Sequence, residues 1–156
     1  MNLHRRRKGF SLIEMLIVIA MILILVSIAV PYYNGARMHA AETAAEAAIR
    51  TIHTVQMQYF SQYGKYAGSI AELGPPMSGG ASATAAGLID VALARGVKGG
   101  YRFTVIATSA GYVIHAEPVV FGTNGTRTFY SDQTMLLREN NSAEPATANG
   151  PESHPN

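Results

Sequence analysis

The chain has 156 residues, enough for one modest domain, with 48% hydrophobic and only 14% charged residues. Its formal charge of +2 depends on four basic residues among the first nine; the rest carries a net charge of −2, which argues against a nucleic-acid-binding surface. The absence of cysteine excludes disulfides, a thiolate nucleophile and cysteine-bound zinc.

Residues 1–9 form a basic leader, and an apolar segment follows it. The leader holds Arg5, Arg6, Arg7 and Lys8 and ends at Gly9. In residues 15–30, Ser27 is the only polar side chain. As one helix, residues 10–30 would span about 31 Å at about 1.5 Å per residue, close to the hydrocarbon thickness of a bilayer. The basic flank should stay cytoplasmic, so residues 10–31 are predicted as a single-pass transmembrane helix with a cytoplasmic N-terminus.

Pro31 closes the apolar segment. It cannot donate a backbone hydrogen bond to the carbonyl of Ser27, and Gly35 weakens the next turn, so we expect a kink or a locally unwound stretch. Residues 32–64 then read as an amphipathic helix that ends at Gly64. Its apolar stripe recurs at steps of three and four residues: Ile49, Ile52, Val55 and Tyr59. Charged side chains are expected off that stripe: Arg37, Glu42, Glu46 and Arg50.

Residues 65–100 are predicted as a loop region with short helices, which connects the long helix to a sheet. Ser69 and Glu72 have the spacing of a capping box, so one short helical turn is expected just after Ser69. Residues 88–94 favour a second short helix before Gly96.

From Tyr101 the hydrophobic period changes to two, which predicts an antiparallel sheet of three to four strands over residues 101–139. Strands are expected at residues 101–108, 112–120, 127–131 and 135–138, with Pro118 limiting the second and Asn124-Gly125 as a hairpin signal. Residues 140–156 hold three prolines and are predicted as a disordered tail. The fold class is therefore α+β, with a long N-terminal helix packed on a small antiparallel sheet.

The junction between the leader and the apolar segment carries the most specific motif. Lys8-Gly9-Phe10-Ser11-Leu12-Ile13-Glu14 resembles the cleavage and methylation signature of the type IV pilin and pseudopilin family. The resemblance continues to Pro31-Tyr32 and covers about residues 5–35. It implies that a prepilin peptidase cuts after Gly9 and methylates the new amine of Phe10. It also implies that Glu14 pairs with the Phe10 amine of a neighbouring subunit, and that Pro31 acts as the helix-breaking proline.

These residues suit that chemistry. Gly9 has no side chain to hinder the scissile bond. An ionised carboxylate such as Glu14 at the head of an apolar helix is costly and needs a partner, so it is a functional residue by default. Neutralising two charges in a low-dielectric helix bundle would favour one axial stagger of the subunits over others.

The predicted function is a structural subunit of a type IV pilus-like filament, with no enzymatic activity and no cofactor. Its expected partners are the prepilin peptidase, other copies in a helical filament, the inner-membrane assembly platform and the lipid bilayer. The chain would lie first in the inner membrane and then in a periplasmic or cell-surface filament.

Two alternatives stay open: a pseudopilin of a type II secretion system, and a signal-anchored periplasmic binding or enzymatic domain. Ser27-Ile28-Ala29 supplies the small residues of an ordinary signal-peptidase site, in favour of the second alternative. Glu14 has no use in a plain signal peptide, and the chain shows no catalytic motif that would favour an enzyme.

No metal site is predicted. His39 and Glu42 lie three residues apart on the helix and could in principle share a metal with His53, but a solvated helix face explains them better. Asp132 stands near Gln133 and Thr134 in a turn, which is too little for calcium.

Other residue groups are interpreted as structural. His115 and Glu117 alternate on one strand and point the same way, as members of cross-strand surface pairs would. The aromatic residues along and beyond the helix are assigned to core packing: Tyr32, Tyr33, Tyr59, Phe60, Tyr63 and Tyr66.

Overall fold

A computed structural model of the chain describes residues 9–153. The predicted basic cluster at residues 5–8 and the last three residues lie outside this range. The chain forms two compact units, Met1–Ala36 and Arg37–Asn156. Helix α1 (Leu12–Tyr63) contributes residues to both.

Helix α1 ends where the sequence predicts. Gly64 follows Tyr63 with a positive φ of 70°, and its N–H donates a 2.8 Å hydrogen bond to the carbonyl of Phe60. A glycine adopts this left-handed conformation without the steric cost that a Cβ would bring, so it closes the last turn.

Two short helices connect α1 to the sheet. The turn expected after Ser69 is present as the 3-10 helix η1 (Ile70–Leu73). Its capping differs from the expected box, because Ser69 makes no side-chain cap and Glu72 instead accepts hydrogen bonds from the Gly68 N–H and the Ser69 hydroxyl. Helix α2 (Val91–Ala94) is shorter than predicted because Asp90 caps it by accepting from the N–H of Leu93 at 3.0 Å.

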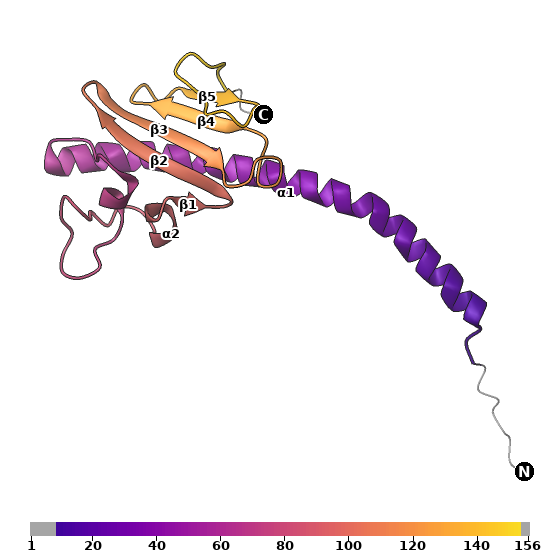
Figure 1. The fold of residues 1–156 in the computed structure, drawn as a ribbon. Coiled ribbons are helices and arrows are strands. Elements are labelled where there is room, and N and C mark those ends of the chain that lie inside the picture. Colours follow the sequence, from indigo (N-terminus) through magenta and orange to yellow (C-terminus); the bar gives the residue numbers. More distant parts are fainter. Residues whose placement is uncertain (1–8, 154–156) are drawn as a thin grey trace, which may run out of the picture. The chain divides into compact units, whose positions relative to one another are not determined.

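Five antiparallel strands form one sheet in sequence order, which confirms the α+β class. They are β1 (Val97–Lys98), β2 (Tyr101–Thr108), β3 (Gly111–Pro118), β4 (Thr128–Asp132) and β5 (Leu137–Asn140). One more strand is present than the three to four expected, because the two residues of β1 are too few to show a period. In Figure 1 the sheet lies across the C-terminal part of α1, within the second unit.

The core lies between this part of α1 and the inner face of the sheet. The predicted alternation on β2 is confirmed, with Tyr101, Phe103 and Val105 buried and the residues between them exposed. From α1, the predicted stripe of Ile49, Ile52, Val55 and Tyr59 is buried, and Ala45 and Ala48 extend it. Apolar burial of this kind is the main stabilising term for the second unit.

The segment after β5 makes specific contacts up to Ser153, in contrast to the expected disordered tail. The N–H of Glu139 donates to the carbonyl of Pro151 at 3.0 Å, and the N–H of Ser153 donates to that of Leu137 at 2.9 Å. Ala146 is 1% exposed. The tail thus pairs with the outer edge of β5, which would otherwise leave its backbone groups unpaired. The low hydrophobicity of the segment predicted disorder, but backbone hydrogen bonds, which do not depend on hydrophobicity, provide much of its order.

Candidate functional site

The predicted scissile bond lies outside any helix. Gly9, Phe10 and Ser11 precede α1 and are not helical. Phe10 is 76% exposed, and a Cβ built on Gly9 would meet no described atom within 4 Å. The Gly9-Phe10 peptide bond is therefore open to an enzyme that must reach its backbone.

Glu14 caps the start of α1. Its Oε2 accepts a 2.8 Å hydrogen bond from the backbone N–H of Ser11, the residue immediately before the helix. This is one half of a capping box, in which an acid in the first turn satisfies an N–H that has no partner in the helix. The Ser11 to Glu14 spacing is visible in the sequence, so this role of Glu14 could have been predicted beside the assembly role.

The first part of α1 exposes apolar side chains around its whole circumference. Every large hydrophobic side chain in residues 12–30 is between 46% and 84% exposed in the subunit. The hydroxyl of Ser27 is satisfied within the helix by donating to the carbonyl of Ile24 at 2.7 Å. A helix that is apolar on all sides must be covered by lipid or by other helices. Among the described residues, α1 is the one helix long and apolar enough to cross a membrane.

Pro31 lies inside α1, and no break in the helix occurs there or at Gly35. The expected locally unwound stretch is therefore absent from the subunit. Proline removes one hydrogen bond from the helix, but the bonds of neighbouring residues remain and can hold the backbone helical. Tyr32 and Tyr33 are 83% and 67% exposed in the subunit, so core packing does not explain them.

An ion cluster in the second unit joins α1 to the sheet. The carboxylate of Glu42 accepts from the N–H of Thr126 at 2.7 Å and from Nε of Arg127 at 3.0 Å. The same guanidinium contacts Glu139 at 2.8 Å and Glu46 at 3.6 Å. One cation thus holds three carboxylates from α1 and β5.

The position of Glu42 corrects the expectation that it lies off the apolar stripe. The residue is only 5% exposed. Burial alone raises the pKa of a carboxyl, but the hydrogen bond from Thr126 and the charge of Arg127 together hold the pKa of Glu42 below its usual value. The signal for its burial was present, because Glu42, Ala45 and Ile49 follow the same three- and four-residue steps.

His53 is buried between α1 and the sheet, where its ring bonds two side chains. Nδ1 lies 2.7 Å from the hydroxyl of Tyr112, and Nε2 lies 2.8 Å from that of Ser131. Ser131 donates its own proton to the carbonyl of Leu136, so Nε2 must carry the hydrogen and Nδ1 must accept from Tyr112. Burial lowers the pKa of His53 and raises the pKa of Tyr112 to about 12, which keeps the ring neutral and the phenol protonated.

The residues considered for metal binding are not brought together. Glu42 and His53 each have the partners described above, and His39 is exposed on α1. Asp132 accepts from the N–H and the hydroxyl of Thr134, which builds the β4–β5 turn. Within residues 9–153, no group of three or more potential metal ligands occurs.

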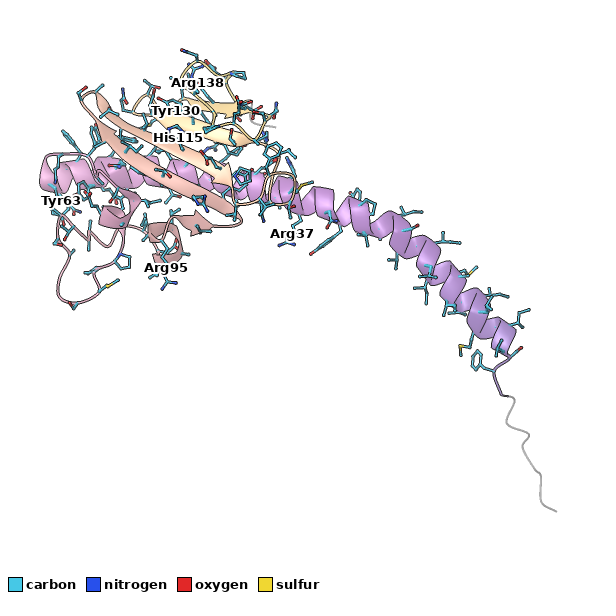
Figure 2. The ribbon with its side chains drawn as sticks, in the orientation of Figure 1. Arg37, Tyr63, Arg95, His115, Tyr130 and Arg138 are labelled. Atoms are coloured by element: carbon cyan, nitrogen blue, oxygen red, sulfur yellow. The ribbon has the colours of Figure 1, made fainter. Side chains whose placement is uncertain are left out.

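The outer face of the sheet carries the predicted cross-strand pairs. His115 packs its ring edge-on against Tyr130, with centroids 5.3 Å apart, and Glu117 stands opposite Arg102. Figure 2 shows His115, Tyr130 and Arg138 close together on the sheet, in agreement with their strand register. This face is built of ordinary surface pairs.

Three features thus occur together near the N-terminus: an open Gly9-Phe10 bond, a glutamate at the head of a helix, and an apolar helix that needs a cover. The apolar helix can anchor the chain in a membrane, and the backbone just before this helix is exposed.

Comparison with known proteins agrees. Residues 4–30 match the family described as the prokaryotic N-terminal methylation motif. Over 69 residues the chain is 33% identical to the type IV major pilin protein PilA of Myxococcus xanthus (strain DK1622). The aligned part is 44% of this chain and only 31% of that relative. No solved structure matches the chain. The N-terminal segment of the chain is thus similar to the type IV pilin and pseudopilin family, in agreement with the sequence motif.

Proposed function

We propose that the chain is the precursor of a structural subunit of a type IV pilus-like filament. The observation that carries this proposal is the open Gly9-Phe10 bond directly before an apolar helix headed by Glu14. A prepilin peptidase cuts after Gly9 and methylates the amine of Phe10. The processed subunit waits in the inner membrane, and an assembly platform then moves it into the filament.

Assembly transfers the exposed apolar helix from one apolar environment to another. In the membrane, lipid surrounds residues 12–30; in the filament, the same side chains pack against the helices of other copies. The Phe10 amine of one subunit meets Glu14 of a neighbour, so both charges are neutralised where water is excluded. The chain itself does no catalysis.

A pilus is favoured over a secretion pseudopilus because the relative is a type IV major pilin. The test is to shear filaments from cells that make the chain, image them by negative stain and identify their subunit by mass spectrometry. A Gly9→Val variant is the control, because a branched side chain at the scissile bond should block processing and filament release. Sheared filaments that contain this chain support the proposal; a chain that stays wholly in the cell envelope while filaments of other proteins form contradicts it.

A further inference from the structure

A rigid loop in the second unit exposes three apolar side chains. The loop between β3 and β4 holds Val119, Val120 and Phe121, which are 43%, 52% and 40% exposed. Apolar side chains gathered on an ordered loop mark an interaction site, because exposure of such a patch to water is unfavourable. We call these three residues the apolar knob.

Hydrogen bonds hold the loop in one conformation. The N–H of Val119 donates to the carbonyl of Gly100 at 2.9 Å, and the N–H of Val120 donates to Oδ1 of Asn124 at 3.1 Å. The loop is tied to α1 by the 2.7 Å bond from the N–H of Thr126 to Glu42. A preformed loop loses little conformational entropy when it binds, so the knob suits docking.

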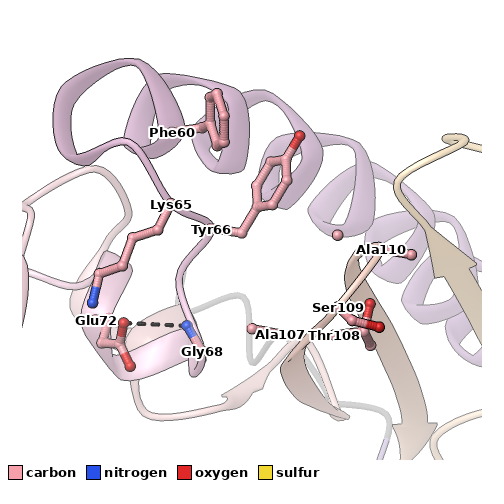
Figure 3. Close-up of a pocket in the computed structure, with 10 residues that line it drawn as sticks. Phe60, Lys65, Tyr66, Gly68, Glu72, Ala107, Thr108, Ser109 and Ala110 are labelled. Carbon is pink, nitrogen blue, oxygen red and sulfur yellow. Dashed lines mark hydrogen bonds between the residues drawn. The ribbon is translucent and has the colours of Figure 1, made fainter.

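An open pocket lies at the other end of the same unit. It has a volume of about 530 Å³ (Figure 3). Its lining comprises the β2–β3 hairpin at residues 107–111 and Phe60, Lys65, Tyr66, Gly68 and Glu72. The rings of Phe60 and Tyr66 are 4.8 Å apart and tilted by 32°. The volume falls within the range of about 300–1,000 Å³ that accommodates drug-sized groups, so one aromatic side chain with its neighbours fits.

The knob and the pocket stand at opposite ends of the helical part of this unit. The knob loop is bound to Glu42, and the pocket is lined by Phe60 from the same helix. About 27 Å of helix separates these two residues at about 1.5 Å per residue. One chain cannot therefore fill its own pocket with its own knob.

We propose that the apolar knob of one copy docks in the Phe60–Tyr66 pocket of a second copy in the filament. Different surfaces of the two copies meet, and a head-to-tail contact of this kind generates an open helical filament when its rotation does not close a ring. The proposal rests on the proposed function, because it gives the second unit its own contact beside that of the N-terminal helices. Phe60 and Tyr66 would offer aromatic partners to Phe121.

Disulfide trapping tests this contact, since the natural chain contains no cysteine. The full chain with Phe121→Cys and Ala110→Cys together is assembled in cells, oxidised and run without reductant. Each copy would link to two neighbours, so we expect a ladder that extends well beyond the dimer. Each single variant should give no species above the dimer. The matched control is Phe121→Cys with Ala148→Cys, in which the second cysteine is exposed but far from the pocket-lining residues in sequence.

The outcomes separate this contact from the proposed function. Filaments without a ladder, a ladder of equal strength in the control, or a dimer as the largest product would overturn the contact and leave the pilin function intact. Absence of filaments from the natural chain would overturn the proposed function, and the contact with it.

A second measurement covers the case in which the double-cysteine chain assembles poorly. Phe121→Asp should lower the yield of sheared filaments at least tenfold while the membrane pool stays within twofold of the natural chain. Thr123→Asp places the same charge in the same loop on an exposed polar residue and should leave the yield unchanged. Equal yields from the two variants would contradict the docking of Phe121.

Discussion

The backbone N–H of Ser11 donates a 2.8 Å hydrogen bond to one carboxylate oxygen of Glu14. The backbone of the same subunit therefore provides one hydrogen-bond donor to the carboxylate of Glu14 at the start of the apolar helix. Because only one oxygen is engaged by this bond, the other can accept the amine of a neighbouring chain without loss of the cap. The cap is therefore compatible with the proposed pairing of Glu14 in the filament.

Glu14→Ala should be processed normally but assemble poorly. Processing depends on Gly9 and the bond after it, which the substitution leaves in place. In the filament the Phe10 amine would lack its counter-charge, and deletion of one partner of a buried pair costs about 3–5 kcal/mol. Even half of that cost would shift the addition of each subunit by more than about tenfold. Glu14→Gln should be milder, because an amide oxygen still accepts a hydrogen bond. The measurement compares the amounts in the membrane pool and in sheared filaments for the natural chain, Glu14→Ala and Glu14→Gln. A filament yield from Glu14→Ala equal to that of the natural chain would show that Glu14 has no assembly role.

Arg127→Met should destabilise the second unit strongly. Glu42 would stay buried with neither its cation nor an exit to water, and Glu46 and Glu139 would keep their charges nearby. Removing one partner of such a pair costs about 3–5 kcal/mol. Arg50→Met changes an exposed residue of α1, so its unfolding midpoint should stay close to that of the natural chain. Denaturant unfolding of the detergent-solubilised chain, followed by near-ultraviolet circular dichroism of its tyrosines, makes the comparison. Equal midpoints for the two variants would mean that the ion cluster contributes little.

The second unit should lose stability in acid in two stages. The pKa of His53 is lowered by burial, with Asp132 partly opposing the shift, so the unfolded chain takes up a proton near pH 6.5 before the folded chain does. The stability that the neutral ring contributes is thus present above pH 6.5 and is lost as pH falls through the folded pKa. Glu42, with its pKa held below 4.5, adds a separate loss below that value. Unfolding midpoints between pH 7.5 and 3.5 should show both stages, and His53→Gln should flatten the first one only. If the first loss of stability in His53→Gln is as large as in the natural chain, it belongs to another group.

Pro31 should matter in the filament more than in the subunit. In the subunit α1 is helical through Pro31, but the carbonyl of Ser27 receives no backbone hydrogen bond from it. We expect the backbone between about residues 20 and 30 to be less regularly helical in the assembled filament, where the helices of other copies pack around it. Such unwinding would let the rod extend while contacts between subunits hold. A filament map with an unbroken helix through these residues would refute the prediction.

The sequence predicts those features that depend on periodicity and on local signals. The apolar stripe of α1, the stop at Gly64 and the alternation along β2 follow from side-chain spacing alone. The spacing of Glu42 places it on the apolar stripe, but its cation, Arg127, lies far along the chain, and only the fold shows how the buried charge is paired. The ordered tail was missed for a similar reason, because its order depends on backbone bonds to β5. At the candidate site, the motif points to Gly9, Phe10 and Glu14. The Ser11 to Glu14 spacing also fits a cap, although the helix predicted from residue 10 begins only after Ser11.

The mature N-terminus tests the central claim most directly. Intact-mass analysis of the protein extracted from membranes, with fragmentation of its N-terminal peptide, reads both the cleavage site and the modification. The account predicts a chain that begins at Phe10 with a methylated amine. A mature chain that begins at Val30, as an ordinary signal peptidase would leave it, would contradict the assignment as a pilin-like subunit.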